Sequence, residues 1–600
     1  MPTPWNTAAD YDRQTFLAEA RELLAGLPGV TDREAARELL FHRIDAIAYR
    51  VVGQDPAFSL FRRSLSRDAA RTLQTLVLAR SAELAGFDLV GVLQDLVADV
   101  PRPELQPGFW AELIHLLRAL HGRPDLDLSE EEDTFDALSG REAAQERSRQ
   151  LDVLWTQIEE RLAHFPDGLS DEARQRRRAR REAVWTALGG DRARWDDWHW
   201  QRDHVITSAE ALTRTVRLDP AQVELVARAR RGRLPFGITP YYASLLDDDW
   251  ETGRDRALRA QVLPPAEYVD ALLNAQGTRA HSLDFMKEAD TSPVDLITRR
   301  YPAIVILKPY NTCPQICVYC QRNWEIEEAL ASDALATPEQ LDQAIAWLAA
   351  HPSIKEVLVT GGDPLTLEDD QLEEVLGRVA ALPHIDMIRI GTRTPVTMPM
   401  RITAPLADLL ASFREPGRRE VVVVTHFEQV YEVTIDTVRA IERLRSRGIA
   451  VYNQHVLQFH VSRRFETVAL RLLLRRIGVD PYYTFVPKGK SELLGYRVPI
   501  ARVLQERNEE ARLLPGIRRT DETVFNVPRL GKNHVRAMQN RDLLAVLPDG
   551  SRVYDFHPWE KHVLEREAFT SVDPPILDYL SRLQAIGEDP AAYHSIWYYY

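Results

Sequence analysis

Cysteine is almost missing from this 600-residue chain, which has three, all between positions 313 and 320. Other absences narrow the class of protein. No apolar run reaches membrane-spanning length, and the start has no basic segment followed by an apolar core, so we expect no membrane partner. The net charge of -14 argues against a nucleic-acid partner, since phosphate binding needs clustered positive charge. Free thiols fit a reducing compartment, so we expect a cytoplasmic protein.

Lysine is scarce as well: seven of the 75 basic residues are lysine, and the rest are arginine. A chain that uses arginine wherever a plain positive charge serves keeps lysine for chemistry that arginine cannot do, such as forming a Schiff base with an aldehyde. The lysines at positions 287, 355 and 561 are interpreted as chance survivors on the surface. The candidates for chemistry are Lys488, Lys490 and Lys532.

The three cysteines stand at spacings of four and three residues, in Asn-Thr-Cys-Pro-Gln-Ile-Cys-Val-Tyr-Cys. This spacing suits Cys313, Cys317 and Cys320 for binding a soft metal centre as thiolates. Iron-sulfur clusters normally have four thiolate ligands, so three leave one iron free to bind something else. Two other interpretations are three buried apolar thiols and half of a zinc site. Zinc is disfavoured because it needs a fourth nearby ligand, and no histidine lies between Cys313 and Trp324.

The chain is too long for one hydrophobic core, so two or three domains are expected. Up to about residue 228, apolar residues recur at spacings of three and four, which predicts helices. From about residue 300, short β-branched runs alternate with helical stretches, which predicts an α/β fold with a parallel sheet, either open and doubly wound or a barrel. The expected strands are 303–307, 356–360, 387–391, 420–425, 450–456, 482–486 and 523–527. A hairpin with Pro548-Asp-Gly at its turn is expected at 544–556, followed by a tail.

Two segments of the helical region raise the question of binding surfaces. The basic run 174–181 is flanked by acidic residues, and we interpret it as the solvated face of a helix rather than a nucleic-acid arm. The cluster 195–200 contains three tryptophans, and we interpret it as aromatic core rather than an interface.

Polar motifs follow the expected strands: Val359-Thr-Gly-Gly-Asp-Pro, Gly391-Thr-Arg-Thr-Pro, Thr425-His-Phe and Asn453-Gln-His-Val. In a parallel barrel such positions form the mouth where ligands bind, and paired glycines let a ligand approach the backbone closely. With the cysteine motif, Ile238-Thr-Pro-Tyr-Tyr upstream and Arg300-Tyr-Pro before the first strand, they resemble the lysine 2,3-aminomutase family of radical S-adenosylmethionine enzymes. The resemblance runs from about residue 235 to 535.

The resemblance implies a partial (β/α)6 parallel barrel, with a large N-terminal helical domain and a short C-terminal hairpin and tail. The expected domains are 1–228, 229–540 and 541–600. It also implies a 4Fe-4S cluster on the three cysteines, whose open iron binds S-adenosylmethionine. The residues expected around that cofactor are Tyr319, Gly361, Gly362, Asp363, Arg393 and Gln454.

The family also uses pyridoxal phosphate, which a catalytic lysine holds as a Schiff base. Lys532 occupies the place of that lysine, although only Gly531 precedes it where the family has a glycine run. Arg300 and Tyr301 match the contacts to the phosphate and ring of the cofactor. The family's second phosphate arginine is Ile304 here, so phosphate binding must differ in detail.

The substrate positions point to an acidic amino acid. Arg322 matches the arginine that holds the substrate α-carboxylate, which a guanidinium can bind bidentately. Where lysine-specific members grip a distal ammonium with two aspartates, this chain has Lys488 and Asn526, like the glutamate 2,3-aminomutase branch. An ammonium beside Lys488 would be a like-charge contact, whereas a carboxylate would be favoured. Lys490 can replace Lys488 if the loop is shifted, and for either lysine a strand-end salt bridge is the alternative.

The implied activity is conversion of L-glutamate to β-glutamate, in which a radical made from S-adenosylmethionine drives migration of nitrogen from C2 to C3. A flavodoxin- or ferredoxin-like donor would supply the electron. The sequence is also compatible with association into a homo-oligomer. The first alternative is isomerisation of lysine or another amino acid. The second is a regulatory or assembly protein with a structural cluster. Arg322 and Lys532 disfavour it, because a structural cluster needs no substrate arginine.

Overall fold

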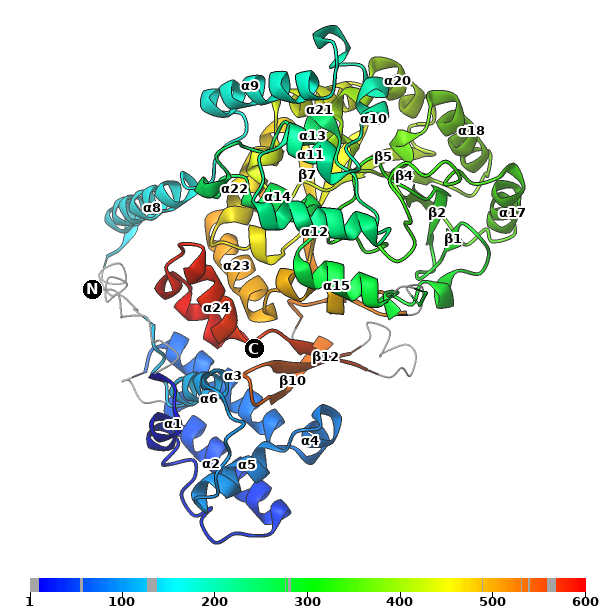
Figure 1. The fold of residues 1–600 in the computed structure, drawn as a ribbon. Coiled ribbons are helices and arrows are strands. Elements are labelled where there is room, and N and C mark those ends of the chain that lie inside the picture. The colour runs from blue at the N-terminus through cyan, green and yellow to red at the C-terminus, as the bar shows by residue number, and fades with distance from the viewer. Residues whose placement is uncertain are drawn as a thin grey trace.

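The computed structural model describes residues 10–53, 58–126, 138–275, 277–278, 282–487, 489–529, 531–537, 540–557 and 568–600. Lys488 and Lys561 lie outside these ranges. The helices nearest the N-terminus and a small C-terminal sheet lie together below a larger part that contains the main sheet (Figure 1).

A nine-stranded sheet forms the centre of the larger part, and its strands follow one another in chain order. β2 to β8 pair in parallel, and the short strands β1 and β9 pair antiparallel at the two edges. The strands are β1 Ile297–Thr298, β2 Ile304–Tyr310, β3 Glu356–Gly361, β4 Met387–Gly391, β5 Glu420–Thr425, β6 Ala450–Val456, β7 Val479–Phe485, β8 Glu522–Val527 and β9 Gly531–His534. Sequential parallel pairing with helical crossovers curls this sheet into the partial barrel that was expected. All seven strands expected from the sequence are confirmed, with ends that differ by at most three residues.

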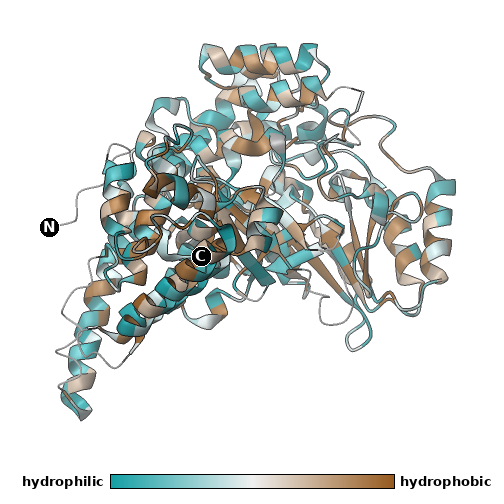
Figure 2. Ribbon diagram, turned by 90° about the horizontal axis from the view of Figure 1, so that it is seen from below, coloured by the Kyte–Doolittle hydropathy of each residue, from teal (hydrophilic) through white to brown (hydrophobic). Residues whose placement is uncertain are grey.

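Crossover helices cover the outer face of the barrel. They are α17 Pro338–Ala349, α18 Asp369–Ala380, α19 Thr394–Thr397, α20 Ala404–Ser412, α21 Ile435–Arg445, α22 Glu466–Ile477 and α23 Ile500–Leu513. α17 begins at a capping box, in which Thr337 Oγ1 accepts from Gln340 N and Gln340 Oε1 accepts from Thr337 N. Its buried residues Leu341, Ala344 and Leu348 recur at three and four and join the barrel core. Accordingly, the strands in Figure 2 are largely brown, and the helices around them carry both colours.

The helices nearest the N-terminus share a core with the C-terminal segments. They are α1 Arg13–Glu19, α2 Arg33–Val52, α3 Leu60–Leu76, α4 Ala79–Ala85, α5 Leu89–Val97 and α6 Pro107–Leu120. The apolar side chains of all of these helices except α4 form one cluster with those of α24 Ile576–Ala585 and the final 3-10 segment η13 Pro590–Tyr598. Ala85 of α4 packs instead against a small cluster on β10 and β11. Inside this region a buried ion pair joins Arg552 Nη2 to Glu112 Oε2 at 2.8 Å. The two ends of the chain are therefore folded against each other.

The other N-terminal helices lie toward the barrel. They are α8 Gly140–Leu162, α9 Asp171–Ala187, α10 Trp198–Asp203, α11 Ala209–Thr215, α12 Pro220–Arg231, α13 Pro240–Ala243, α14 Arg256–Val262 and α15 Ala266–Asn274. The tryptophans at 195, 198 and 200 belong to the barrel core, which confirms their interpretation as core. The helices up to residue 228 thus divide between two cores, and the expected domain bounds stay a prediction.

The basic run on α9 is only in part the solvated face that its composition predicted, since Arg174 and Arg178 are exposed. Arg177 and Arg180 are buried. Arg177 Nη1 donates to Gly168 O at 2.7 Å, and Arg180 Nε donates to Leu246 O at 2.8 Å. A guanidinium has five donors and can satisfy several carbonyls at once, so these arginines attach α9 to the rest of the fold.

The C-terminal hairpin is confirmed as β10 Arg541–Val546 and β11 Arg552–Phe556, with Gly550 at a φ of 92° in its turn. The segment expected as a tail adds a third strand, β12 Phe569–Asp573, which pairs antiparallel with β11. Among the described residues, no helix is both long and apolar enough to cross a membrane.

Candidate active site

The carboxyl ends of the parallel strands surround a cavity of about 330 Å³, which we call the barrel cavity. Strand side chains of the same parity, such as Leu358 and Thr360 on β3, form its wall, because every second side chain faces the same side. This is the end of a parallel barrel where ligands bind. Nine residues expected around the cluster and S-adenosylmethionine line it: Cys313, Cys317, Tyr319, Cys320, Gly361, Gly362, Asp363, Arg393 and Gln454.

The loop that carries the cysteines is fixed by residues far upstream. Ile316 N donates to Gly237 O at 2.9 Å, and Val318 N donates to Gln261 O at 2.8 Å. Backbone hydrogen bonds leave a loop little freedom, so the segment before the barrel sets the position of the thiols.

The surroundings of the three thiols fit a cluster. Burial raises the pKa of Cys313 and Cys317, and metal binding displaces the proton that burial retains. Arg393 Nη1 donates to Cys317 Sγ at 2.9 Å, and the backbone N–H of Arg322 donates to Cys320 Sγ at 3.3 Å. Within the described ranges, no group of three His, Cys, Asp or Glu side chains is placed to hold a single metal ion. A four-iron cluster does not require such a group, because each thiolate binds a different iron.

The two glycines after β3 are explained by the chain itself. A Cβ on Gly362 would lie 1.9 Å from Thr312 O, and a Cβ on Gly361, whose φ is +118°, would lie 2.8 Å from Tyr310 O. The backbone of the cysteine loop therefore passes too close for any side chain. The sequence had suggested close approach of a ligand, and the structure shows close approach of another part of the chain.

Asp363 and Arg393 are held in a buried network. Asp363 accepts hydrogen bonds from Thr392 Oγ1 at 2.6 Å and from Arg393 N at 2.8 Å. The Arg393 side chain forms an ion pair with the fully buried Glu432, with Nη2 2.7 Å from Oε1. Both side chains therefore have fixed positions at the wall of the barrel cavity.

A buried carboxylate that no motif indicated, Glu288, also lines the cavity and is 2% exposed. Its Oε1 accepts from Lys308 Nζ at 2.9 Å and from Arg322 Nη1 at 2.5 Å, and its Oε2 pairs with Arg300 Nη2 at 3.3 Å. Glu325 forms a further ion pair with Arg322. Burial alone would raise the pKa of Glu288, but Arg322, Lys308 and Arg300 hold it well below its usual range. The arginines expected to hold the substrate and the cofactor phosphate thus share one internal carboxylate.

Lys308 could have been identified from the sequence as a candidate site residue. It is one of seven lysines, and it is followed five residues later by the first cysteine. It stands two residues from Ile306, which lines the barrel cavity, so both side chains face the interior of the barrel. Glu288 lies outside every motif, and glutamate is too common in this chain for its presence there to attract attention.

Lys532 has the surroundings of a reactive amine. Its Nζ lies 4.8 Å from the ring centroids of both Tyr301 and Tyr483, and its backbone N–H donates to Tyr301 Oη at 2.8 Å. Burial, with smaller effects of Arg389 and Arg300, lowers the pKa of Lys532 to about 8. A neutral amine is the nucleophilic form, so this lysine is closer to reactivity at neutral pH than an exposed lysine.

The distal substrate positions are only partly described. Asn526 lines the barrel cavity and pairs in register with Lys532, so the two side chains share one face of the sheet. Lys488 lies outside the described residues. Lys490 is buried, and its Nζ is 2.7 Å from Glu492 Oε1, so it forms the salt bridge that was the alternative interpretation. Lys490 also lines the barrel cavity, so its replacement of Lys488 stays a prediction.

The relationship of the chain to known proteins agrees with this geometry. The radical SAM superfamily matches residues 307–470. An uncharacterised KamA family protein of Methanocaldococcus jannaschii is 41% identical over 590 residues, which cover 94% of each chain. The chain belongs to the KamA family. Its membership of the radical SAM superfamily implies a 4Fe-4S cluster and S-adenosylmethionine.

Named aminomutases are similar to about half of this KamA family chain. A glutamate 2,3-aminomutase of Clostridioides difficile is 31% identical over 311 residues, covering 52% of this chain and 69% of that protein. An L-lysine 2,3-aminomutase of Fusobacterium nucleatum is 33% identical over 314 residues, with the same coverage. The family is thus one of radical SAM aminomutases, and the nearly equal identities do not separate the two substrates.

Proposed function

We propose that this KamA family protein is a pyridoxal phosphate-dependent 2,3-aminomutase that moves the α-amino group of L-glutamate to C3. The observation that carries the proposal is Lys532, a scarce lysine held between two tyrosines on the cavity side of the sheet, with its pKa lowered to about 8. The names of the relatives support the reaction type. Isomerisation of L-lysine is the alternative.

Cys313, Cys317 and Cys320 would hold the cluster, and Arg393 and Asp363 would fix the side of the cavity where S-adenosylmethionine binds. When bound, these two groups supply radical hydrogen-atom abstraction, and pyridoxal phosphate supplies the ring system that carries the migrating nitrogen. The protein's own contribution is position and exclusion of water, because side reactions of a radical are prevented by a closed, ordered site.

Lys532 would bind pyridoxal phosphate, with the rings of Tyr301 and Tyr483 each 4.8 Å from the amine. Arg300 offers positive charge for the phosphate. Arg389 lies close enough to lower the pKa of Lys532, and it is paired with Glu356. It is our candidate to replace the family's second arginine, which is Ile304 here. These contacts support the assignment of Lys532 as the cofactor lysine.

An acidic substrate is supported by the charges around the cavity. The carboxylates that line its described part are Glu288 and Asp363, and both are already engaged by cations, a hydroxyl and a backbone N–H. Asn526 can donate a hydrogen bond to a distal carboxylate, and Lys488 would add a positive charge. The distal ammonium of a lysine substrate would instead meet Lys488, a cation, where lysine-specific members have an aspartate.

Arg322 would bind the α-carboxylate of the substrate, although it is paired with Glu288 in the free protein. Lys308 also contacts Glu288, so this buried carboxylate keeps a cation when Arg322 turns to the substrate and Arg300 to the cofactor phosphate. This matters because leaving a buried charge without a partner costs several kcal/mol, about 3 to 5. Lys308 thus makes the release of Arg322 easier.

The proposal is tested by anaerobic reconstitution with iron, sulfide, pyridoxal phosphate, S-adenosylmethionine and a chemical reductant, followed by incubation with single amino acids. We expect β-glutamate from L-glutamate, detected by chromatography and mass, and much less product from L-lysine. Turnover of L-lysine equal to or above that of L-glutamate would place the protein with the lysine enzymes. If no amino acid gives a β-isomer, the proposed reaction is wrong.

Partners and location also remain proposals. Reduction of the cluster requires an electron, and a flavodoxin- or ferredoxin-like protein is the donor that we expect. We keep a cytoplasmic location and association into a homo-oligomer as predictions.

A further inference from the structure

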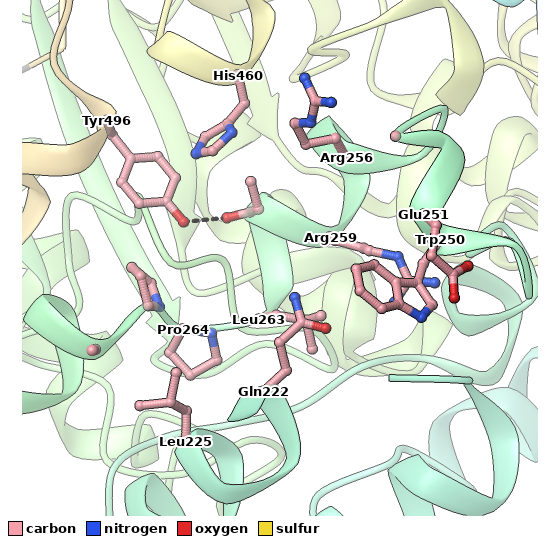
Figure 3. Close-up of a pocket in the computed structure, with 14 residues that line it drawn as sticks. Gln222, Leu225, Trp250, Glu251, Arg256, Arg259, Leu263, Pro264, His460 and Tyr496 are labelled. Atoms are coloured by element: carbon pink, nitrogen blue, oxygen red, sulfur yellow. Dashed lines mark hydrogen bonds between the residues drawn. The ribbon is translucent and has the colours of Figure 1, made fainter. Parts of the chain in front are cut away.

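A second cavity of about 460 Å³ lies beside the barrel and takes no part in the proposed reaction. We call it the side cavity. Its lining residues come from α12, α14 and α15 and from the 3-10 segments η3 Trp250–Thr252, η8 Phe459–Val461 and η9 Ser491–Tyr496. Figure 3 shows His460 and Arg256 at one end, Tyr496 beside His460, and Gln222 and Leu225 at the opposite end.

Three polar groups of the side cavity lack partners. Within the described part of the chain, the Arg256 guanidinium makes no hydrogen bond or ion pair. His460 Nδ1 and Gln222 Oε1 are buried without a hydrogen-bond partner. Arg259 differs, because its Nε donates to Asp255 Oδ2 at 2.8 Å and its other nitrogens donate to backbone carbonyls. Since buried polar atoms in folded proteins are normally paired, the unpaired ones mark a place for a bound molecule.

The charge nearest to that molecule is positive, because Arg256 lines the side cavity. Glu466 and Glu588 act to raise the pKa of Arg256, but Glu466 is already paired with Arg463. Burial, with Arg582 and Arg256, lowers the pKa of His460 to about 4, so its ring is neutral at pH 7. Glu251 also lines the side cavity but is exposed, and solvent screens its charge. A guanidinium without a partner recognises a carboxylate or a phosphate. The ligand should therefore carry one anionic group next to Arg256.

The remaining walls are apolar. They are formed largely by Trp250, Leu225, Leu263 and Pro264 (Figure 3). An indole ring offers a flat surface, and a planar ring packs well against such a surface. The volume lies within the range of small-molecule sites. These features fit a planar ring that carries the anionic group.

Helix α14 connects the side cavity to the cysteine loop. Tyr496 lines both cavities, and its Oη donates to Ala260 O at 2.5 Å. The next residue, Gln261, accepts a hydrogen bond from Val318 N at 2.8 Å through its carbonyl and one from Tyr319 Oη at 3.2 Å through Oε1. A ligand that displaces α14 or Tyr496 therefore also displaces residues next to Cys317 and Cys320.

We propose that the side cavity is a second binding site, for a small organic anion composed of a planar ring with one carboxylate or phosphate group, and that its occupancy alters the cluster through α14. Arg256 binds the anionic group, and Gln222 and His460 hydrogen-bond to the ring substituents. The site is an effector site, because none of its lining side chains other than Tyr496 reaches the barrel cavity.

Binding is tested by isothermal titration calorimetry of the reconstituted protein. Saturating S-adenosylmethionine and pyridoxal phosphate occupy the cofactor positions of the barrel cavity, and Arg256→Gln separates binding in the side cavity from binding at the substrate position. The probes are benzoate, its neutral analogue benzamide, adenosine 5'-monophosphate and its neutral analogue adenosine. We expect at least one anion to bind saturably, and its neutral analogue to bind at least tenfold more weakly. Arg256→Gln should lower the affinity for that anion at least tenfold. The control variant Arg439→Gln, which changes an exposed arginine outside the side cavity, should leave the affinity unchanged.

Coupling is tested by the electron paramagnetic resonance signal of the reduced cluster and by the rate of S-adenosylmethionine cleavage without substrate. The bound anion should change the signal, or change this rate at least twofold, in the unaltered protein but not in Arg256→Gln. Binding of benzoate alone identifies a carboxylate ligand, and binding of the nucleotide alone identifies a phosphate ligand. The proposal is overturned if neither anion binds, if the neutral analogues bind equally well, if Arg256→Gln keeps its affinity, or if binding leaves the cluster unchanged. None of these measurements depends on glutamate turnover, so their failure is separate from failure of the proposed function.

Discussion

Lys532 permits the sharpest test of the cofactor site, because its reactivity can be worked out from its surroundings. Burial, with smaller effects of Arg389 and Arg300, lowers its pKa to about 8. An exposed lysine has a pKa near 10.4, so at pH 7 the fraction of neutral amine at Lys532 is about 200 times larger. Allowing for the weaker nucleophilicity of a less basic amine, we expect pyridoxal phosphate to label Lys532 at least tenfold faster than an exposed lysine.

The assay is brief incubation with pyridoxal phosphate, reduction with borohydride and peptide mass analysis across pH 6 to 10. Labelling at Lys532 should rise with pH, reach half of its maximum near pH 8 and level off above it, because a lowered pKa frees the amine at lower pH. Exposed Lys355 serves as the internal comparison, and Lys532→Arg should remove the main label. A label found mainly at Lys488 or Lys490 would refute the assignment of the cofactor lysine and the substrate argument with it.

Three further predictions follow from the same geometry. Cys317→Ala should lose the cluster of about four irons and the cleavage of S-adenosylmethionine, and full activity in this variant would contradict the cluster assignment. Lys488→Asp combined with Asn526→Asp should lower glutamate turnover at least tenfold, measured as β-glutamate formed, because two carboxylates would repel the substrate; unchanged turnover would show that these residues do not face it. Glu288→Gln should lower the free energy of unfolding in urea by about 3 kcal/mol or more, since three cations lose their counter-charge, whereas Glu373→Gln, at an exposed position of α18, should change it little. Equal midpoints for the two glutamate variants would refute the role given to the Glu288 network.

The sequence determined the features that depend on neighbours along the chain. The cysteine spacing indicated a cluster. The alternation of β-branched runs with segments of helical periodicity located seven strands to within three residues. Strand and helix periodicities are local properties, so they can be read without knowing what packs against them. The scarcity of lysine directed attention to Lys532 for the same reason, because composition needs no fold.

Only the tertiary structure decided which charges meet. Glu288 precedes the barrel, Lys308 lies on β2 and Arg322 follows the cysteines, yet these three side chains form one buried network. The basic run on α9 looked solvated because its composition is polar, and long-range contacts bury Arg177 and Arg180 instead. The energetic worth of a charge depends on its burial and its partners, which come from distant segments. Hydrophobic and cysteine patterns could therefore be interpreted from the sequence alone, whereas the pairing of Lys490, the shared carboxylate of Arg322 and the side cavity required the folded chain.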